Sequence, residues 1–361
     1  MQKDLPFWLA FNFFSGIGPQ RFKLLLKYFG KAQKAYEANE ETLLKTGLGV
    51  NLVSQFLIFR QKFNPQGFYE EVKKKGITIL TLKDKNYPDS LRQISDCPPV
   101  LYIKGQIKIE DELAVAIVGT RKISAYGREV TEILTRDLVA SGLTIVSGLA
   151  RGVDSLAHKT ALEAGGRTIA VLGCGVDLVY PPENKALYEQ IILHGAVVSE
   201  VAPGQYVAKG IFPARNRIIA GLSLGVVVTE GAEDSGALIT ARDAANQGRE
   251  VFAVPGPITS YLSAASAILI KEGAKLVYHV SDILEELDIK SKVKSQKAKK
   301  IIPENPEEEK ILQILENERL HIDSLVRISG MEAGRIASLL TLMEIKGKVK
   351  NLGGMVYTIN K

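Results

Sequence analysis

The chain has 361 residues, 46% of them hydrophobic, so its length indicates two or three globular domains. Its 46 Lys and Arg against 40 Asp and Glu give a net charge of +6. That sum favours an anionic partner only weakly, because an ordinary solvated basic surface gives the same value. Cys97 and Cys174 lack the spacing of a metal or redox motif, which predicts buried thiols in a reducing compartment. The N-terminus lacks a signal-peptide pattern and no apolar stretch approaches the ~20 residues of a membrane span, so we expect a soluble, cytoplasmic protein without a membrane span.

Residues 1–75 are expected to form an all-helical domain, because apolar residues recur at helical spacing in RFKLLLKYF and NLVSQFLIF. A weak repeat, GIGPQRFKLLL from Gly16 and GLGVNLVSQFL from Gly47, places a glycine turn before each of two helices. In a helix-hairpin-helix module such a turn presents backbone N–H groups to a phosphate. A plain glycine turn between two helices explains the same pattern, and both interpretations stay open.

Residues 76–290 alternate between short apolar runs and helical stretches. Six runs, LAVAIVG, LTIVSG, TIAVLG, AVVSE, GVVVTE and VFAVPG, are apolar on both faces. This pattern is typical of parallel strands covered on both sides, so it predicts an α/β, doubly wound parallel sheet. ITILTL and VLYIKG, which precede these runs, are expected to add edge strands.

The last part of the chain is expected to hold a linker and a small domain. Residues 291–306 are lysine-rich and then acidic, which predicts a flexible linker. Residues 307–361 show three helical segments and a hairpin at Gly353-Gly354, the order of a winged helix. From residue 301 on there are eight Lys and Arg against nine Asp and Glu, a difference of minus one, which argues against a strong stand-alone DNA reader.

Ligands of an open parallel sheet collect beyond the carboxyl ends of its strands. The first of these loops lacks the Rossmann G-x-G-x-x-G motif and no P-loop is present, so neither a dinucleotide dehydrogenase nor a P-loop NTPase is expected. Arg121 follows Gly119 and Thr120 there, and it suits either a phosphate or a neighbouring carboxylate. Ser235 and Gly236 open a helix and offer a second anion site, although helix capping alone explains Ser235.

Asp154 and His158 stand at i and i+4 and are read as a catalytic pair or, more commonly, a helix-surface hydrogen bond. The four histidines are scattered and no cluster has metal-ligand spacing, so no metal is expected.

The stretch FPARNRIIAGLS, residues 212–223, places charge at the start of an apolar helix. Helical projection puts Ile218, Ile219 and Leu222 on one face, with Arg215 along that face and Arg217 almost opposite. Arg215 therefore needs an anionic partner, either a phosphate or a structural carboxylate, whereas Arg217 and Lys209 are expected to face outward or across the strand edge. Phe212 precedes the helix and suits a stacked base or a hydrophobic staple equally well.

These segments, from AIVGTRKISAYGR through SGLARGVDSLAHKTALEAGG, SEVAPG and FPARNRIIAGLS to SGALITARDAANQGREVFAVPGP, strongly resemble the DNA-processing protein A family, also called Smf. The resemblance covers roughly residues 110–290, and the flanking parts fit the family layout. It implies a helical SAM or helix-hairpin-helix-like domain over 1–75, an extended Rossmann-like DNA-binding domain over 76–290, a linker over 291–306 and a winged helix over 307–361. It also implies a cytoplasmic recombination mediator that binds single-stranded DNA, protects it and loads RecA recombinase in natural transformation.

The resemblance further implies a homodimer, no cofactor and no established catalytic activity. Gly119-Thr120-Arg121 looks like the phosphate-binding loop, and Lys209 and Phe212 resemble the basic and base-stacking positions before the arginine motif. Ala267 and Leu276 lie in the stretch that resembles the dimer surface. The complete set of expected DNA-binding residues is Gly119, Thr120, Arg121, Gly148, Arg151, Lys209, Phe212, Arg215, Asn216, Arg217, Ser235 and Gly236.

The alternative function is a nucleotide-binding enzyme similar to the phosphoribohydrolases. It is disfavoured because EDSGALITARDA has no second glycine before Thr240 and has Asp243 where a glutamate would be wanted. A sequence-specific regulator that acts through the winged helix is weakened by the charge balance of that domain.

Overall fold

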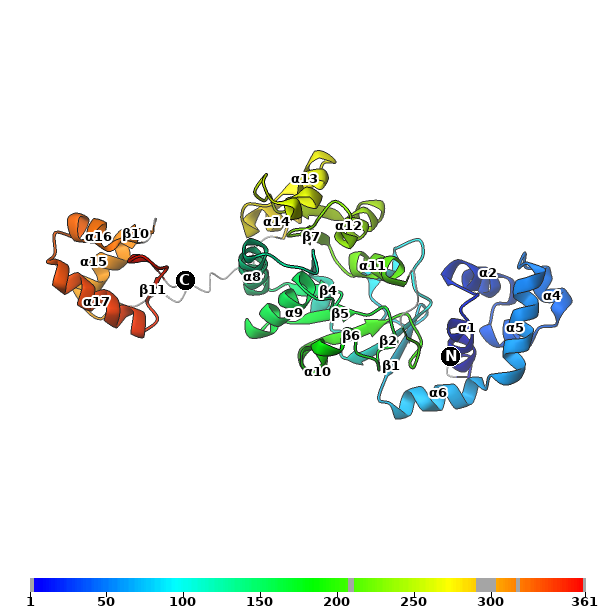
Figure 1. Ribbon diagram of the computed structural model, residues 1–361. Helices are drawn as coiled ribbons and strands as arrows, with labels where there is room; N and C mark the ends of the chain where they lie inside the picture. Colours follow the sequence, from blue (N-terminus) through cyan, green and yellow to red (C-terminus); the bar gives the residue numbers. More distant parts are fainter. Residues whose placement is uncertain (1–2, 207–210, 290–302, 316–318, 360–361) are drawn as a thin grey trace. The chain divides into compact units, whose positions relative to one another are not determined.

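The structure is a computed structural model that describes residues 3–206, 211–289, 303–315 and 319–359, except for the side chains of residues 211–213. The chain forms two compact units, Met1–Lys292 and Val293–Lys361, and Figure 1 shows the elements of each. None of the helices described is long and apolar enough to cross a membrane. Lys209 and most of the expected linker at 291–306 lie outside the described residues.

The first 75 residues are helical, as predicted. They form α1 (Leu5–Phe13), α2 (Pro19–Phe29), α3 (Ala32–Glu37), α4 (Glu40–Leu44), α5 (Val50–Lys62) and α6 (Pro65–Lys74). Aromatic side chains fill their core, where Phe11 stacks on Phe56 with ring centroids 5.0 Å apart. Gly18 and Gly49 are the residues directly before α2 and α5, so the repeated glycine turns do open two helices.

A nine-stranded sheet forms the centre of the first unit, in the order β1-β2-β6-β5-β4-β3-β7-β8-β9. The strands are β1 (Thr78–Thr81), β2 (Val100–Gly105), β3 (Ala114–Val118), β4 (Thr144–Ser147), β5 (Thr168–Val171), β6 (Ala196–Ser199), β7 (Gly225–Val228), β8 (Glu250–Ala253) and β9 (Lys275–Leu276). β3 to β9 are parallel, and β1 and β2 are added antiparallel at one side. All eight predicted strands are present, but only one of the two expected edge strands, β1, lies at an edge, because β2 lies between β1 and β6. β9, a two-residue strand, was not predicted.

Helices cover both faces of the sheet (Figure 1). One face carries α8 (Ala125–Ala140), α9 (Val153–Glu163), α10 (Lys185–His194) and α14 (Val280–Glu286); the other carries α7 (Asp89–Arg92), α11 (Ile211–Gly221), α12 (Gly236–Asn246) and α13 (Ala264–Lys271). Short 3₁₀ helices lie at Ile109–Glu112, Pro182–Asn184 and Tyr261–Ser263. Alternate residues of the same strands pack on opposite faces, as Val115 and Ile117 pack with α8 and α9 while Ala116 and Val118 pack with α11 and α12. Continuous apolar strands are required because both faces are buried.

The order in which successive strands are added to the sheet reverses between β3 and β7, since β4 to β6 follow on one side of β3 and β7 to β9 on the other. These strands are parallel neighbours, but β3 leads into α8 on one face and β7 leads into α12 on the other. Diverging connections leave a crevice at the carboxyl ends of the two strands, which is where ligands of open α/β sheets bind.

The second unit is a winged helix, as predicted. It contains α15 (Pro306–Leu315), α16 (Ile322–Ser329) and α17 (Ala333–Ile345), with β10 (Leu320–His321), β11 (Val349–Asn351) and β12 (Val356–Ile359) in the order β10-β12-β11. Gly353 and Gly354 turn the hairpin with φ of 98° and 58°, a conformation that favours glycine. Ile311, Leu340 and Met343 are fully buried in its core.

Candidate nucleic-acid interface

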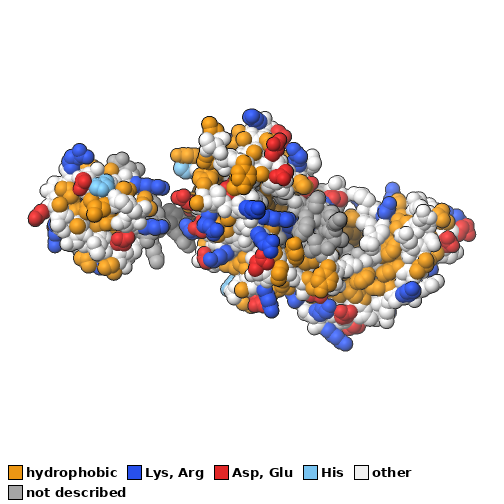
Figure 2. Space-filling view, viewed as in Figure 1, with side chains coloured by type: hydrophobic (Ala, Val, Ile, Leu, Met, Phe, Trp, Pro, Cys, Tyr) orange, Lys and Arg blue, Asp and Glu red, His pale blue; other side chains and the backbone are white. Residues whose placement is uncertain are grey.

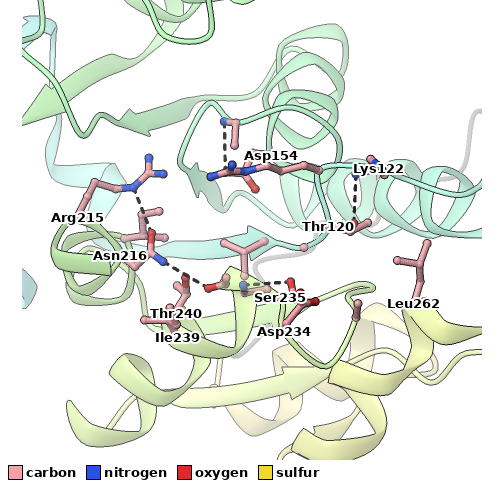
Figure 3. Close-up of a pocket in the computed structure, with 18 of the residues that line it drawn as sticks. Thr120, Lys122, Asp154, Arg215, Asn216, Asp234, Ser235, Ile239, Thr240 and Leu262 are labelled. Carbon is pink, nitrogen blue, oxygen red and sulfur yellow. Dashed lines mark hydrogen bonds between the residues drawn. The ribbon is translucent and has the colours of Figure 1, made fainter. Parts of the chain in front are cut away.

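A cavity of about 560 Å³ occupies the crevice between β3 and β7. Its walls come from the loop after β3, the loop after β4, the start of α11 and the start of α12. In Figure 3, Thr120 and Lys122 lie at one end of the view and Arg215 and Asn216 at the other. The structure therefore brings together, around one cavity, seven residues predicted as DNA-binding: Gly119, Thr120, Arg121, Arg215, Asn216, Ser235 and Gly236.

The loop after β3 is held in place by Glu230, at the end of the β7 segment. The N–H of Thr120 donates to the carbonyl of Glu230 (2.8 Å), and the N–H and hydroxyl of Ser124 donate to its carboxylate (both 2.7 Å). A Cβ on Gly119 would lie 2.8 Å from the Glu230 carbonyl oxygen, so the glycine permits this close approach. The loop is thus fixed at both ends, with Arg121 and Lys122 exposed along its middle.

Arg215 is buried at the cavity, with 6% of its surface exposed. Its Nη1 donates to the carbonyl of Gly148 (2.7 Å) and to that of Val171, and its Nε donates to the side chain of Asn216 (3.2 Å). Burial lowers the pKa of this guanidinium, whereas the nearby Asp154 carboxylate raises it. Carbonyl oxygens and Asp154 together supply the anionic surroundings that a buried arginine requires.

Arg217 does not face outward, the first of its two predicted directions, and instead reaches Glu200, the residue directly after β6. Its Nε lies 2.6 Å from a carboxylate oxygen of Asp96 and its Nη2 lies 2.7 Å from one of Glu200, with only 10% of the side chain exposed. It is absent from the cavity lining. The helix does present Arg215 and Arg217 to different surroundings, but Arg217 is surrounded by two carboxylates rather than by solvent.

The start of α12 forms the opposite wall. Ser235 precedes the helix and its hydroxyl accepts from the N–H of Ala237 (3.3 Å), which confirms the predicted cap. Thr240, one turn further, is buried and lines the cavity, while the side-chain amide of Asn216 donates to the carbonyl of Gly236 (3.4 Å). The N-terminus of an eleven-residue helix and two hydroxyl groups thus face the same space as Arg215.

Other predicted residues lie beside the cavity or beyond it. Gly148 holds Arg215 through its carbonyl oxygen, and a Cβ there would lie 2.3 Å from the guanidinium. Arg151 is exposed and forms an ion pair with Glu183. Lys209 and the side chain of Phe212 lie outside the described residues, so their expected roles stay predictions.

Asp154 and His158 do not form a pair, and neither is on the helix surface. Both are buried: the Asp154 carboxylate accepts from the N–H of Gly148 (3.1 Å), and the His158 ring bonds to Thr168 (2.6 Å). Burial lowers the pKa of His158 to about 3, so the ring is neutral at physiological pH. Asp154 lines the cavity, but its hydrogen bonds order the loop after β4.

The charges at this edge are mixed, with a positive excess at the rim. Lys and Arg side chains gather in the centre of the α/β part in Figure 2, in the area where Figure 1 labels β4 and β7. Asp154 and Asp234 are the carboxylates among the lining residues. Across the part of the chain that is described, no group of His, Cys, Asp and Glu could hold a metal ion. Cys97 and Cys174 are free and buried, as predicted.

Sequence reasoning missed Glu230 and Lys122. Glu230 was available as the acid that ends the strand run GVVVTE, because a carboxylate directly after a buried strand commonly binds the next loop or helix start. Lys122 follows Arg121 in the same exposed loop and lines the same cavity.

Fold and crevice together define a Rossmann-like α/β protein whose crevice is lined by guanidinium, hydroxyl and helix N-terminal groups. Comparison with known families specifies it further. The sequence model of the DNA recombination-mediator protein A family matches residues 78–288, and that of the DprA winged helix domain matches residues 295–355. The chain belongs to the DNA recombination-mediator protein A family, which assigns it to DNA processing.

Individual relatives agree with this assignment. The chain is 35% identical to Protein Smf of Synechocystis, over 97% of this chain and 98% of that protein, and 46% identical to DNA processing protein DprA of Streptococcus pneumoniae, over 58% and 74%. The X-ray structure of the Streptococcus pneumoniae protein matches 77% of this chain and 95% of its own, with a TM-score of 0.68 and 37% identity. A structure of the Helicobacter pylori protein, described for its single-stranded DNA binding mode, matches 59% of this chain and 96% of its own, with a TM-score of 0.53 and 31% identity.

Proposed function

We propose that this chain is a recombination mediator that binds single-stranded DNA in the crevice between β3 and β7. The observation that carries the proposal is the convergence on one cavity of exposed Arg121 and Lys122, buried Arg215 and the N-terminus of α12. The Helicobacter pylori relative, whose structure is described for its single-stranded DNA binding, supports the choice of ligand.

In this proposal the strand lies along the carboxyl edge of the sheet. Arg121 and Lys122 bind phosphates from the loop after β3, and the N-terminus of α12 with Ser235 and Gly236 binds another phosphate. Arg215 and Asn216 form the floor of the cavity, and Gly148 fixes Arg215. Arg151 extends the basic rim, while Lys209 and Phe212 keep the basic and base-stacking roles predicted from the sequence. Phosphate contacts and stacking predict binding that tolerates different base sequences.

The test is a titration of the full chain with labelled oligo-dT and with a duplex of equal length, at two salt concentrations. We expect tighter binding of the oligo-dT, a loss of affinity with salt, and a clear loss in Arg121→Ala. Arg136→Ala is the matched control, since Arg136 is exposed on α8 and absent from the lining of the crevice. Equal affinity for both DNAs together with an unaffected Arg121→Ala would refute the proposal.

We further propose that the chain protects incoming single-stranded DNA and loads RecA onto it in natural transformation, in the cytoplasm. The measurement is the rate at which RecA forms filaments on oligo-dT covered by a single-strand-binding protein. We expect this chain to raise that rate and Arg121→Ala to raise it less.

We also propose a homodimer through the edge of the sheet at β9. Leu276 on β9 is 45% exposed and Ala267 on α13 is exposed, so both can reach a second copy. An edge strand with an exposed apolar side chain is suited to pairing with another chain.

We propose that the chain acts by binding rather than by catalysis. The alternative, a phosphoribohydrolase-like enzyme, needs a carboxylate at the position of Asp243. Asp243 is absent from the cavity lining, and the charges that act on its pKa are those of Asp96 and Arg217. Release of free base from a nucleoside monophosphate would favour the enzyme instead.

A further inference from the structure

A second cavity, of about 480 Å³, lies where the starts of α1 and α3 meet β1 and the turn after it. We call it the lysine pocket, after Lys3, Lys31 and Lys83, which line it around Trp8. It shares no lining residue with the crevice between β3 and β7. The function proposed above does not use it.

Of the three lysines of the pocket, Lys83 acts on an acid at its wall, since its charge helps to lower the pKa of the Asp4 carboxyl. All three are exposed, and across the described residues none of them forms an ion pair. The ammonium group of Lys83 lies 5.4 Å from the centre of the Trp8 ring, a cation–π contact that holds it over the pocket. Three ammonium groups therefore face one space from three separate segments.

The two carboxylates of the pocket are occupied by other groups. Asp4 accepts from the N–H of Gln33 (2.8 Å), the indole N–H of Trp8 (3.0 Å) and the N–H of Ala32 (3.2 Å). Asp84 accepts from the N–H and hydroxyl of Thr81, both at 2.7 Å. These acids order the walls of the pocket, and the lysine ammonium groups are left as its donors to a ligand.

The helical part of the chain, which supplies most of the lining of this pocket, carries a positive excess. Residues 1–75 contain 12 Lys and Arg and 6 Asp and Glu, a difference of +6 that equals the net charge of all 361 residues. A positive surface of this kind attracts a polyanion.

A smaller hollow shares a lining residue with the lysine pocket and also reaches the start of α11. This hollow, of about 180 Å³, is lined by Trp8 on one side and by Ala214 on the other. Ala214 directly precedes Arg215, which lines the crevice, and Trp8 also lines the lysine pocket. The hollow therefore lies beside both the start of α11 and the lysine pocket, along the direction in which a strand bound in the crevice would extend to reach the lysines.

We propose that the lysine pocket binds a phosphate group of the single DNA strand that occupies the crevice, so that the N-terminal helices extend the DNA-binding surface. The inference rests on the proposed function for the path of the strand. The phosphate fits because compact ammonium groups on flexible stems bind it as point charges, without the fixed geometry of an arginine. Trp8 is buried and its N–H is taken by Asp4, so no base stacking is assigned to it.

The test compares two double variants of the full chain, Lys31→Gln with Lys83→Gln and Lys62→Gln with Lys74→Gln. The second pair is the control, because Lys62 and Lys74 are exposed, lie in the same helical part and line none of the cavities named here. Each chain is titrated with a short oligo-dT that just saturates the crevice, with a long oligo-dT, and with dTMP. Arg121→Ala is measured in parallel.

We expect the pocket variant to weaken binding of the long oligo-dT and to leave the short one unchanged. Removal of one phosphate contact on a single strand lowers the salt slope by about 0.7, so wild-type affinity should fall about 2.6-fold more than that of the variant between about 50 and about 200 mM salt. Binding of the long oligo-dT equal to that of the control variant would overturn the inference. The proposed function would still stand if Arg121→Ala loses affinity in the same experiment.

Two further outcomes are distinguishable. In the first, neither oligo-dT binds, dTMP does bind, and only the pocket variant loses dTMP binding. The proposed function then fails, whereas the phosphate pocket is supported, with a free nucleotide rather than DNA as the origin of the phosphate. If polyglutamate binds and only the pocket variant loses that binding while DNA affinity is unchanged, the pocket takes an acidic peptide and the inference is overturned.

Discussion

Replacement of Arg217 by alanine should destabilise the fold rather than remove a DNA contact. Arg217 joins α11 to Asp96 and Glu200 through contacts of 2.6 and 2.7 Å, and 10% of its side chain is exposed. Removing one partner of a buried pair costs about 3 to 5 kcal/mol, because the other charge is left buried. Asp96 is 42% exposed and can be solvated, so we expect about 3 kcal/mol, the lower end of that range.

The pH dependence of this loss has a defined sign. Burial raises the pKa of Glu200 above its ordinary value, whereas Arg217 lowers it, so the pKa should rise further in Arg217→Ala. The folded variant then holds the Glu200 proton more tightly than the unfolded chain does. Its free energy of unfolding must therefore fall as pH rises from the ordinary carboxyl pKa of about 4.3 to the raised value, by about 1.4 kcal/mol for each unit between the two.

Urea unfolding at about pH 5 and about pH 8 measures both effects. The exposed Arg136→Ala should change the free energy of unfolding little at either pH, and the double variant of Arg217→Ala with Glu200→Gln should recover part of the loss. A stability of Arg217→Ala equal to that of wild type, together with a large loss of oligo-dT affinity, would refute this reasoning and restore Arg217 as a DNA contact.

Three other variants test the site and the dimer. Glu230→Gln keeps an acceptor for the N–H of Ser124 but removes the negative charge and places an amide donor against the Ser124 hydroxyl. It should therefore cost about 1 to 3 kcal/mol in urea unfolding and lower oligo-dT affinity, and an unchanged titration would contradict this expectation. Gly152→Ala should lower the free energy of unfolding by more than Gly142→Ala does. Both glycines have positive φ, where an alanine costs about 1 to 2 kcal/mol, but only at Gly152 would the new Cβ also lie 2.2 Å from a backbone oxygen. Leu276→Glu should shift the proposed dimer toward monomer in size-exclusion chromatography with light scattering.

The controls for these variants are matched in chemistry. Glu129→Gln changes the same group at an exposed position of α8, and Leu193→Glu places the same charge at a 71% exposed leucine on α10. If Leu193→Glu and Leu276→Glu behave alike, the edge at β9 is not the dimer surface.

The sheet was predictable from the sequence because burial on both faces requires uninterrupted apolar runs. The strand β9 was not, because it has two residues and both Lys275 and Leu276 are exposed. The crevice followed from the rule that ligands bind at the carboxyl ends of parallel strands, which placed Arg121 and Ser235 at one edge before any contact was known.

The surroundings of individual charged groups were not predictable. A helical projection separates the directions of Arg215 and Arg217, but it contains nothing about Asp96 and Glu200, which come from other segments of the chain. For the same reason a spacing of i and i+4 could not show that Asp154 and His158 bind different partners. The fold brings these groups together, and only the folded structure shows which charges meet.

The position of Glu230 explains how a Rossmann-like sheet can be directed away from dinucleotides. In dinucleotide-binding proteins the helix after the first strand directs its free N–H groups at the pyrophosphate. In this chain the residue before the corresponding helix, Ser124, gives its N–H and hydroxyl to the Glu230 carboxylate, which is only 4% exposed. The protein's own carboxylate thus takes the place of the cofactor's anion at the entrance to α8, and an incoming phosphate is left with the side chains of the loop and the opposite helix. Such an arrangement suits a long ligand that passes across the edge of the sheet better than a small one enclosed by it.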